Sequence, residues 1–250
     1  RLVWNDPSTY HWLYWPERPP WTPQALLVAG CGTGEAVALA LQNPSASVVG
    51  IDISQTALDH QQALADEHKV DNLELIQLPI ERALELGRTF DFVSVAGVLH
   101  HLADPAAGLK ALGAVLRPHG VIVGAVYGRH ARLGVHLVQQ TLRDIGAGRD
   151  PSGVALARSA LSGLAPHHPV QGWLAATAPV WGPDAHLVDA WLPAREATFD
   201  TDGVLSLVAD AGLAFQGWFD NRHYHPDGLF EPGHPAHAAL SALAPAAMWR

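Results

Sequence analysis

The stretch "VAGCGTGEA", residues 28–36, carries three glycines at alternate positions. The run that leads into it, "ALLVAG" at 25–30, is short and continuously apolar, which is typical of a strand buried on both faces. The residues that follow, "EAVALALQ", are typical of a helix that stops before Pro44. A strand, a glycine loop and a helix in this order predict a nucleotide site in an α/β fold.

The spacing of the glycines indicates which nucleotide the loop can hold. A dinucleotide fingerprint has the pattern G-x-G-x-x-G and places a pyrophosphate on the helix N-terminus. Here Gly30 and Gly32 match, but Glu35 occupies the third position and the remaining glycine is Gly34. The Glu35 carboxylate would compete with phosphate for the positive end of the helix. The loop therefore favours a ligand that is cationic or neutral at this point.

Strand-like and helix-like segments alternate along the rest of the first half. The expected later strands are 46–52, 72–78, 90–99 and 120–127. The helix after residue 54 has Ser54 as its N-cap, and a second begins at Asp104-Pro105 and runs to the "RPHG" stretch. Five strands with intervening helices predict an α/β fold with a doubly wound, mostly parallel sheet.

The chain divides into four predicted parts. An aromatic-rich segment, 1–23, precedes a cofactor-binding Rossmann-like core at 24–127. Residues 128–200 contain helical patterns and predict a helical insertion after the fifth strand, placed as a lid over the carboxyl edge of the sheet. Residues 201–250 return to the core with a helix, a sixth strand at 213–221 and a tail.

Composition excludes several classes of partner. A chain of 250 residues with 48% hydrophobic content can bury a full core. Its formal net charge of −9 argues against a nucleic-acid partner. Its single cysteine, Cys31, excludes an internal disulfide. The apolar runs are shorter than the roughly 18 residues of a membrane span. We expect a cytoplasmic protein with no membrane partner, and we draw nothing from the start at Arg1.

Asp52 ends the second predicted strand, eighteen residues beyond Gly34. A carboxylate at this place can accept hydrogen bonds from both hydroxyls of a ribose. The alternative is a loop aspartate that begins a helix. The neighbouring glycine loop favours the ribose role.

Four blocks of sequence, taken together, carry a specific resemblance. The blocks are "LLVAGCGTGEAVALAL", "VVGIDIS", "FDFVSVAGVLHHLADP" and "LRPHGVIVGAVY". In order and spacing they resemble the class I S-adenosylmethionine-dependent methyltransferases, over about 24–127, with 201–220 resembling that fold's closing elements. The resemblance implies a seven-stranded sheet of the methyltransferase type. It also implies S-adenosylmethionine as cofactor and S-adenosylhomocysteine as product.

The resemblance also implies which residues contact the cofactor. The glycines would line its methionine part, Asp52 would hold the ribose, and Ile53 and Ile80 would flank the adenine. The full predicted set is Gly30, Cys31, Gly32, Gly34, Asp52, Ile53, Pro79, Ile80 and Ala96. Two positions depart from the family. Val28 stands where an acid is usual, which leaves the cofactor's ammonium without a partner, and Pro79-Ile80 stands where Asp-Ala is common. Glu81 is either a replacement acceptor for the adenine or a solvated helix residue.

Methyl transfer from a sulfonium is a direct displacement, so the protein must align the reactants and exclude water. A general base is needed only where the acceptor carries a proton of high pKa. The predicted base is His101, just past the fourth strand, followed by Tyr127 and His130, past the fifth. The alternative for His101 is an imidazole that only holds its loop.

Three further residues are predicted substrate contacts: His100, Tyr14 and Trp191. Tyr14 belongs to the aromatic stretch 10–21, which either covers the cleft or anchors the N-terminus, and the anchor is favoured. Trp191 either lines a pocket or belongs to a satellite core. The histidines at 223–225 and 234–237 have ligand-like spacing, but with no cysteine or placed carboxylate beside them we expect no metal.

The predicted function is methyl transfer from S-adenosylmethionine to a small molecule. Three alternatives stay open: a non-catalytic binding member of the fold, a methyltransferase that acts on proteins, and a nicotinamide-dependent oxidoreductase. The acidic charge would suit a basic protein substrate, and Glu35 disfavours the nicotinamide cofactor.

Overall fold

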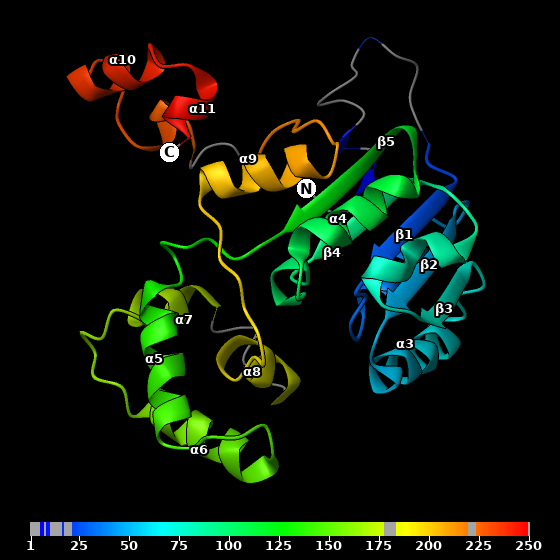
Figure 1. Ribbon diagram of the computed structural model, residues 1–250, viewed down its shortest axis with the longest axis horizontal. Coiled ribbons are helices and arrows are strands. Elements are labelled where there is room, and N and C mark those ends of the chain that lie inside the picture. The colour runs from blue at the N-terminus through cyan, green and yellow to red at the C-terminus, as the bar shows by residue number, and fades with distance from the viewer. Residues whose placement is uncertain are drawn as a thin grey trace. The chain divides into compact units, whose positions relative to one another are not determined.

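The computed structural model describes residues 6, 7, 9, 10, 17, 22–177, 184–219 and 224–249. The chain forms two compact units (Figure 1). The first unit comprises the chain up to Leu99, Asp104–Val126 and the chain from Thr201 onward, and the second comprises His100–Ala103 and Tyr127–Asp200. Each unit is described separately below. Among the residues given above, no helix is long and apolar enough to cross a bilayer.

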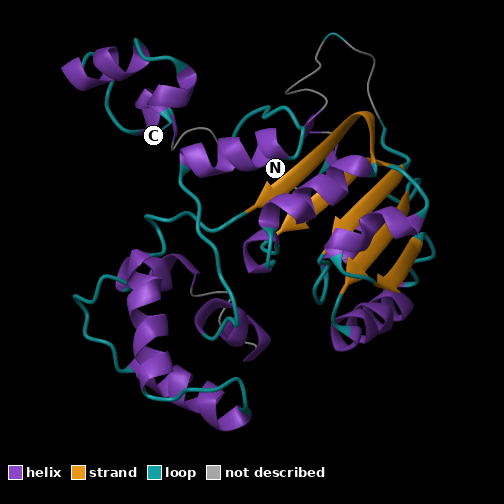
Figure 2. Cartoon of the chain, viewed as in Figure 1, coloured by secondary structure: helices purple, strands orange, loops and turns teal. Residues whose placement is uncertain are grey.

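The first unit is built on a parallel sheet of five strands in the order β3-β2-β1-β4-β5, drawn in orange in Figure 2. The strands are β1 (Ala25–Ala29), β2 (Ser47–Asp52), β3 (Leu73–Gln77), β4 (Phe90–Ala96) and β5 (Leu116–Ala125). All five carboxyl ends lie at one edge because every pair is parallel. The winding reverses between β1 and β4, which is where ligands bind in open α/β sheets.

Helices flank this sheet and carry the caps that the sequence predicts. They are α2 (Glu35–Gln42), α3 (Gln55–His68), η1 (Ile80–Leu86), α4 (Pro105–Ala114) and α9 (Thr201–Asp210), and the tail adds η5 (Pro226–Gly228), α10 (Pro235–Ser241) and α11 (Pro245–Met248). The Ser54 hydroxyl accepts from the N–H of Ala57, and Asp104 accepts from Ala107 with Pro105 in the first turn. These side chains satisfy N–H groups that a helix start leaves open.

The core beside β1 fixes the start of α2. Leu26, Val28 and Phe92 from the strands pack with Leu39 of α2, and Tyr10 joins the same cluster with its ring centroid 5.8 Å from that of Phe92. Tyr10 is 3% exposed. This packing agrees with the anchoring interpretation of the aromatic stretch, whereas Tyr14 lies outside the described residues.

Two expectations about the sheet are wrong. Residues 213–219 of the expected sixth strand form no strand, so the described residues supply five of the seven strands that the resemblance implies. This segment and β5 both line a cavity of about 660 Å³. The helix after Asp104 ends at Ala114, earlier than expected, because Leu116 already pairs with Phe90. The "RPHG" stretch therefore lies inside β5, where His119 adopts a φ of +67°.

The second unit is helical over most of its described length. Its helices are α5 (Leu133–Asp144), α6 (Pro151–Ser162), α7 (Gln171–Thr177) and α8 (Asp184–Trp191), together with η2 (Leu99–His101), which begins in the first unit. Val135, Leu142, Leu187 and Trp191 form its apolar core, and a parallel bridge joins Gly128 to Phe199. The helical character of 128–200 is as expected, and its placement over the sheet edge stays a prediction.

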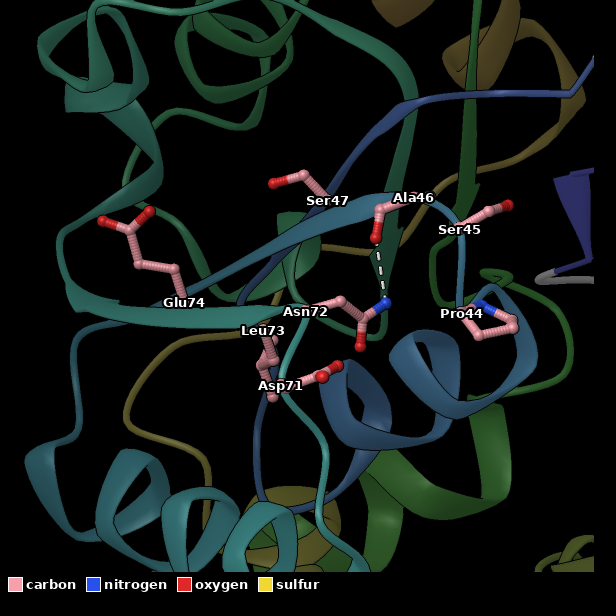
Figure 3. Close-up of a pocket in the computed structure, with 8 residues that line it drawn as sticks. All are labelled: Pro44, Ser45, Ala46, Ser47, Asp71, Asn72, Leu73 and Glu74. Carbon is pink, nitrogen blue, oxygen red and sulfur yellow. Dashed lines mark hydrogen bonds between the residues drawn. The ribbon is translucent and has the colours of Figure 1, made fainter.

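A pocket of about 360 Å³ lies at the amino ends of β2 and β3, at the opposite edge from the glycine loop (Figure 3). Its central side chain is Asn72, whose amide nitrogen donates to the carbonyls of Ala40, Asn43 and Ala46 at 3.3, 3.0 and 2.9 Å. Asn72 thereby ties the end of α2 to the start of β2. The pocket is best explained as a structural joint between these elements.

We predict that Asn72→Ala lowers the free energy of unfolding by about 1–2 kcal/mol, because the Ala46 carbonyl loses its donor and the carbonyls of Ala40 and Asn43 keep only a backbone N–H. Urea unfolding measures this change. Exposed Asp71, on the same pocket wall, supplies the control Asp71→Ala. Equal stability of the two variants would contradict the structural role of Asn72.

Candidate functional site

The glycine loop leaves β1 at the point where the sheet reverses its winding. Gly30 has a φ of +69°, and a Cβ atom there would lie 2.5 Å from Cγ2 of Val98. Any side chain at this position is thus excluded both by the backbone conformation and by space. The N–H groups of Gly30 and Cys31 both donate to the carbonyl of Ile51, at 2.8 and 3.0 Å. The loop is therefore bonded to the end of β2, where Asp52 follows.

A buried glutamine holds the loop from the other side. The amide nitrogen of Gln61 donates to the carbonyls of Cys31 and Gly32 at 2.8 and 3.0 Å, and its amide oxygen accepts from the N–H of Val37 at 3.0 Å. Gln61 is 0% exposed. Sequence reasoning missed it. The available signal was its place on the face of α3 that also buries Leu58 and Ala65, where a polar residue needs a partner.

Asp52 lies at the carboxyl end of β2, beside the loop. Its Oδ2 accepts from the N–H of Gly32 at 2.9 Å and its Oδ1 from the N–H of Ser54 at 2.8 Å. Each carboxylate oxygen can accept more than one hydrogen bond, so both retain capacity for a ligand hydroxyl. These bonds fix the orientation of a carboxylate that is partly buried.

Glu35 supplies a second carboxylate on the other side of the loop. It opens α2, and its Oε1 accepts a short hydrogen bond from the hydroxyl of Ser94 on β4. Burial raises the pKa of Glu35, and the bond from Ser94 opposes this rise only in part. Cys31, between the two carboxylates, is itself buried. Burial and the charges of Asp52 and Glu35 raise the pKa of its thiol to about 12, so the thiol stays protonated.

The predicted adenine-side residues follow β2 and β3. Ile53, next to Asp52, is 73% exposed, which is unusual for an isoleucine and leaves its side chain available to a flat apolar ligand. Ile80 opens η1 and is buried behind Pro79. Ala96 ends β4 and pairs with Ala125. The cofactor contacts of these residues stay predictions.

Comparison with known proteins agrees with this geometry. A family of methyltransferase domains matches residues 27–122. An uncharacterised protein of Synechococcus sp. is 30% identical over 91% of this chain and 56% of its own length. A ubiquinone biosynthesis O-methyltransferase of Acinetobacter baylyi is 30% identical over 43% of this chain and 45% of its own length.

A solved structure agrees over nearly the whole chain. PKMT2 from Rickettsia typhi in complex with AdoHcy superposes with a TM-score of 0.71 at 17% identity, over 98% of this chain and 49% of that one. The fold is thus shared. The family match at 27–122 agrees with the resemblance of the sequence to the class I S-adenosylmethionine-dependent methyltransferases. The chain spans about half the length of the curated relatives it matches.

The second unit holds a partly buried polar cluster, which we call the Tyr127 cluster. Its members are His100, His101, Tyr127, Arg132, Asp189 and Glu196. The ring of Tyr127 has the His100 ring centroid at 3.8 Å and the Arg132 guanidinium at 3.8 Å. Arg132 is 1% exposed and forms an ion pair with Glu196. Such a buried charge pair is costly to disrupt.

The two neighbouring histidines have opposite electrostatic surroundings. Burial, followed by the charge of His101, lowers the pKa of His100 to about 4, so its fully buried ring is neutral at pH 7. Burial also lowers the pKa of His101, but Asp189 and the carbonyl of Arg195 outweigh this effect and raise it. His101 Nε2 lies 3.1 Å from Oδ1 of Asp189, and its Nδ1 lies 2.9 Å from that carbonyl.

The remaining predicted residues lie in different surroundings. His130 is exposed. Trp191 is 1% exposed and packs edge-on against Trp173, which agrees with the satellite-core interpretation and does not support a substrate contact.

In the tail, Asp227 contacts His237 at 2.5 Å and His225 at 3.1 Å, a placed carboxylate that the sequence did not reveal. Among the described residues these three form no group suited to a metal ion.

We predict that Gln61→Leu lowers the free energy of unfolding by about 2–4 kcal/mol, because the buried carbonyl of Cys31, the buried N–H of Val37 and the partly buried carbonyl of Gly32 all lose their side-chain partner. The exposed neighbour in Gln62→Leu is the matched control, since its amide contacts only Asp66. Chemical denaturation of both variants measures the difference. A Gln61 variant as stable as the Gln62 variant would remove the glutamine from its role in the loop.

The raised pKa of His101 predicts a pH-dependent stability. The folded protein holds a proton that the unfolded chain releases near pH 6.5, so the contribution is complete below that pH. It is lost as the pH rises through the higher pKa of the folded state. Thermal melts at several pH values should therefore show wild type losing its advantage over His101→Gln toward alkaline pH. His130→Gln is the exposed control, and an advantage that grows with pH would contradict the ion pair with Asp189.

Proposed function

We propose that this chain catalyses methyl transfer from S-adenosylmethionine to a small-molecule acceptor. The observation that carries the proposal is the pair of carboxylates, Asp52 and Glu35, beside a glycine loop in which Glu35 replaces the third glycine of the dinucleotide pattern. The relative from Acinetobacter baylyi, named for O-methylation in ubiquinone biosynthesis, supports a small acceptor.

The cofactor contacts that we propose follow from the first unit. Backbone atoms of Gly30, Cys31, Gly32 and Gly34 surround the methionine part. Asp52 accepts from the ribose hydroxyls through the lone pairs that its two backbone N–H bonds leave free. Ile53, Ile80 and the backbone of Pro79 border the adenine, and Ala96 ends β4 beside the loop. The sulfonium of the cofactor is a cation, and two carboxylates provide a site that stabilises positive charge.

The reaction that we propose is a direct displacement. A lone pair of the acceptor attacks the methyl carbon, the carbon–sulfur bond breaks, and its electrons return to sulfur to give S-adenosylhomocysteine. The acceptor's proton, where it has one, passes to a base. We keep His101 as the proposed base and Tyr127 behind it, since Asp189 would stabilise the imidazolium that forms. His100, buried and neutral, is proposed to position Tyr127.

A second candidate function is methylation of a protein side chain. The net charge of −9 favours it, because an acidic protein attracts a basic substrate segment. Incubation with isotopically labelled cofactor separates the two. Label in low-mass products of a metabolite extract supports the small acceptor, and label only in the protein fraction supports the second candidate.

We predict that S-adenosylhomocysteine raises the melting temperature of the protein and that NAD does not. Asp52→Ala should weaken the affinity for S-adenosylhomocysteine about tenfold or more, because charge-assisted hydrogen bonds to the ribose are lost. Asp59→Ala, on the exposed face of α3, is the control. Calorimetric titration provides both affinities. Stabilisation by NAD alone would sink the methyltransferase proposal, and unchanged affinity in Asp52→Ala would remove Asp52 from the ribose role.

A further inference from the structure

Val28 stands where related loops carry an acid, so the cofactor's ammonium group needs another partner. On β1 and β4, Val28 is paired in register with Ser94. In parallel strands, residues in register point to the same face of the sheet. Val28 packs in the cluster that includes Ala36 and Leu39 of α2, so this is the face that α2 covers. The missing acid would therefore have projected toward the start of α2.

Glu35 brings a carboxylate to this place from the helix instead of the strand. It is the first residue of α2, and its Oε1 is held by the hydroxyl of Ser94, the strand neighbour of Val28. Ser94 is fully buried, so its hydroxyl is held in place and fixes the orientation of the partly buried carboxylate. Among the described residues, none donates a hydrogen bond to the second oxygen, Oε2.

The charge of this carboxylate is not balanced within the described residues. None of the ion pairs that they form includes Glu35 or Asp52. Two carboxylates near one loop, both acting on the thiol of Cys31, make the site electronegative. An uncompensated, partly buried carboxylate destabilises the folded protein, because its charge is removed from water. A bound cation would offset that cost.

We infer that Glu35, oriented by Ser94, binds the α-ammonium group of S-adenosylmethionine and takes over the role of the acid absent at Val28. The inference rests on the proposed function and adds the residue that recognises the amino-acid end of the cofactor. Each carboxylate then binds a different group of the cofactor: Asp52 binds the ribose hydroxyls and Glu35 binds the ammonium group. Glu35 is a binding residue, with no part in the transfer itself.

The test compares two ligands on two proteins. The ligands are S-adenosylhomocysteine and its analogue in which hydrogen replaces the α-amino group, and the proteins are wild type and Glu35→Gln. Glutamine retains the bond from Ser94 but carries no charge. We expect calorimetric titration to show that Glu35→Gln weakens binding of S-adenosylhomocysteine by about 10- to 100-fold. The same substitution should leave the affinity for the analogue within about twofold.

Glu67→Gln, on the exposed end of α3, is the matched control and should bind both ligands as wild type does. Equal weakening of both ligands in Glu35→Gln would overturn the inference, because Glu35 would then act on the loop as a whole. Unchanged affinity for S-adenosylhomocysteine would overturn it as well. If wild type binds neither ligand, the proposed function fails, which is distinguishable from either result.

A measurement on wild type alone keeps the inference testable if Glu35→Gln does not fold. Because burial raises the pKa of Glu35, a fraction of the protein molecules carries a proton on Glu35 as the pH falls toward the range in which carboxyl groups titrate. An incoming ammonium favours the ionised form, so S-adenosylhomocysteine should release protons that the deaminated analogue does not. Titration in buffers of different ionisation enthalpy detects this release, and equal release by both ligands would contradict the contact.

Discussion

The carboxamide of Gln61 is the constraint on which the site depends. The loop after β1 is bonded to the end of β2, and its carbonyl groups at Cys31 and Gly32 face the buried side chain of Gln61. One buried side chain bonds both carbonyls and also the N–H of Val37 at the start of α2. Strand, loop and helix are thereby held in a single arrangement, and the proposed contacts of Asp52 and Glu35 with a cofactor presuppose it.

Charge explains why this loop suits a sulfonium cofactor. A phosphate-binding loop presents free N–H groups and a positive helix end to its ligand. Here Asp52 occupies the N–H of Gly32, and Glu35 stands in the first turn of α2. Both features lower the affinity for an anion and raise it for a cation. The raised pKa of Glu35 expresses the same imbalance, since desolvation without a counter-charge disfavours ionisation. The glycines alone do not distinguish between nucleotides, and it is Asp52 and Glu35 that favour a cationic cofactor.

Much of the first unit could be predicted because its elements are defined locally. A continuous apolar run predicted β1, and the caps Ser54 and Asp104 predicted the helix starts. What failed depends on tertiary contacts. The segment 213–219 was expected to be a strand, but it pairs with no strand of the described sheet. The roles of Gln61 and of Arg132 with Glu196 arise from partners 24 or more residues away, which single-sequence patterns do not reveal.

We infer that Asp52 and Glu35 bind two polar groups of one cofactor, the ribose hydroxyls and the α-ammonium group. A crystal structure of the protein with S-adenosylhomocysteine bound tests it most directly. The account predicts the ribose hydroxyls within hydrogen-bonding distance of Asp52 and the amino nitrogen within hydrogen-bonding distance of Glu35. A ligand that turns its amino group away from Glu35, or that lies away from the end of β1, would contradict it.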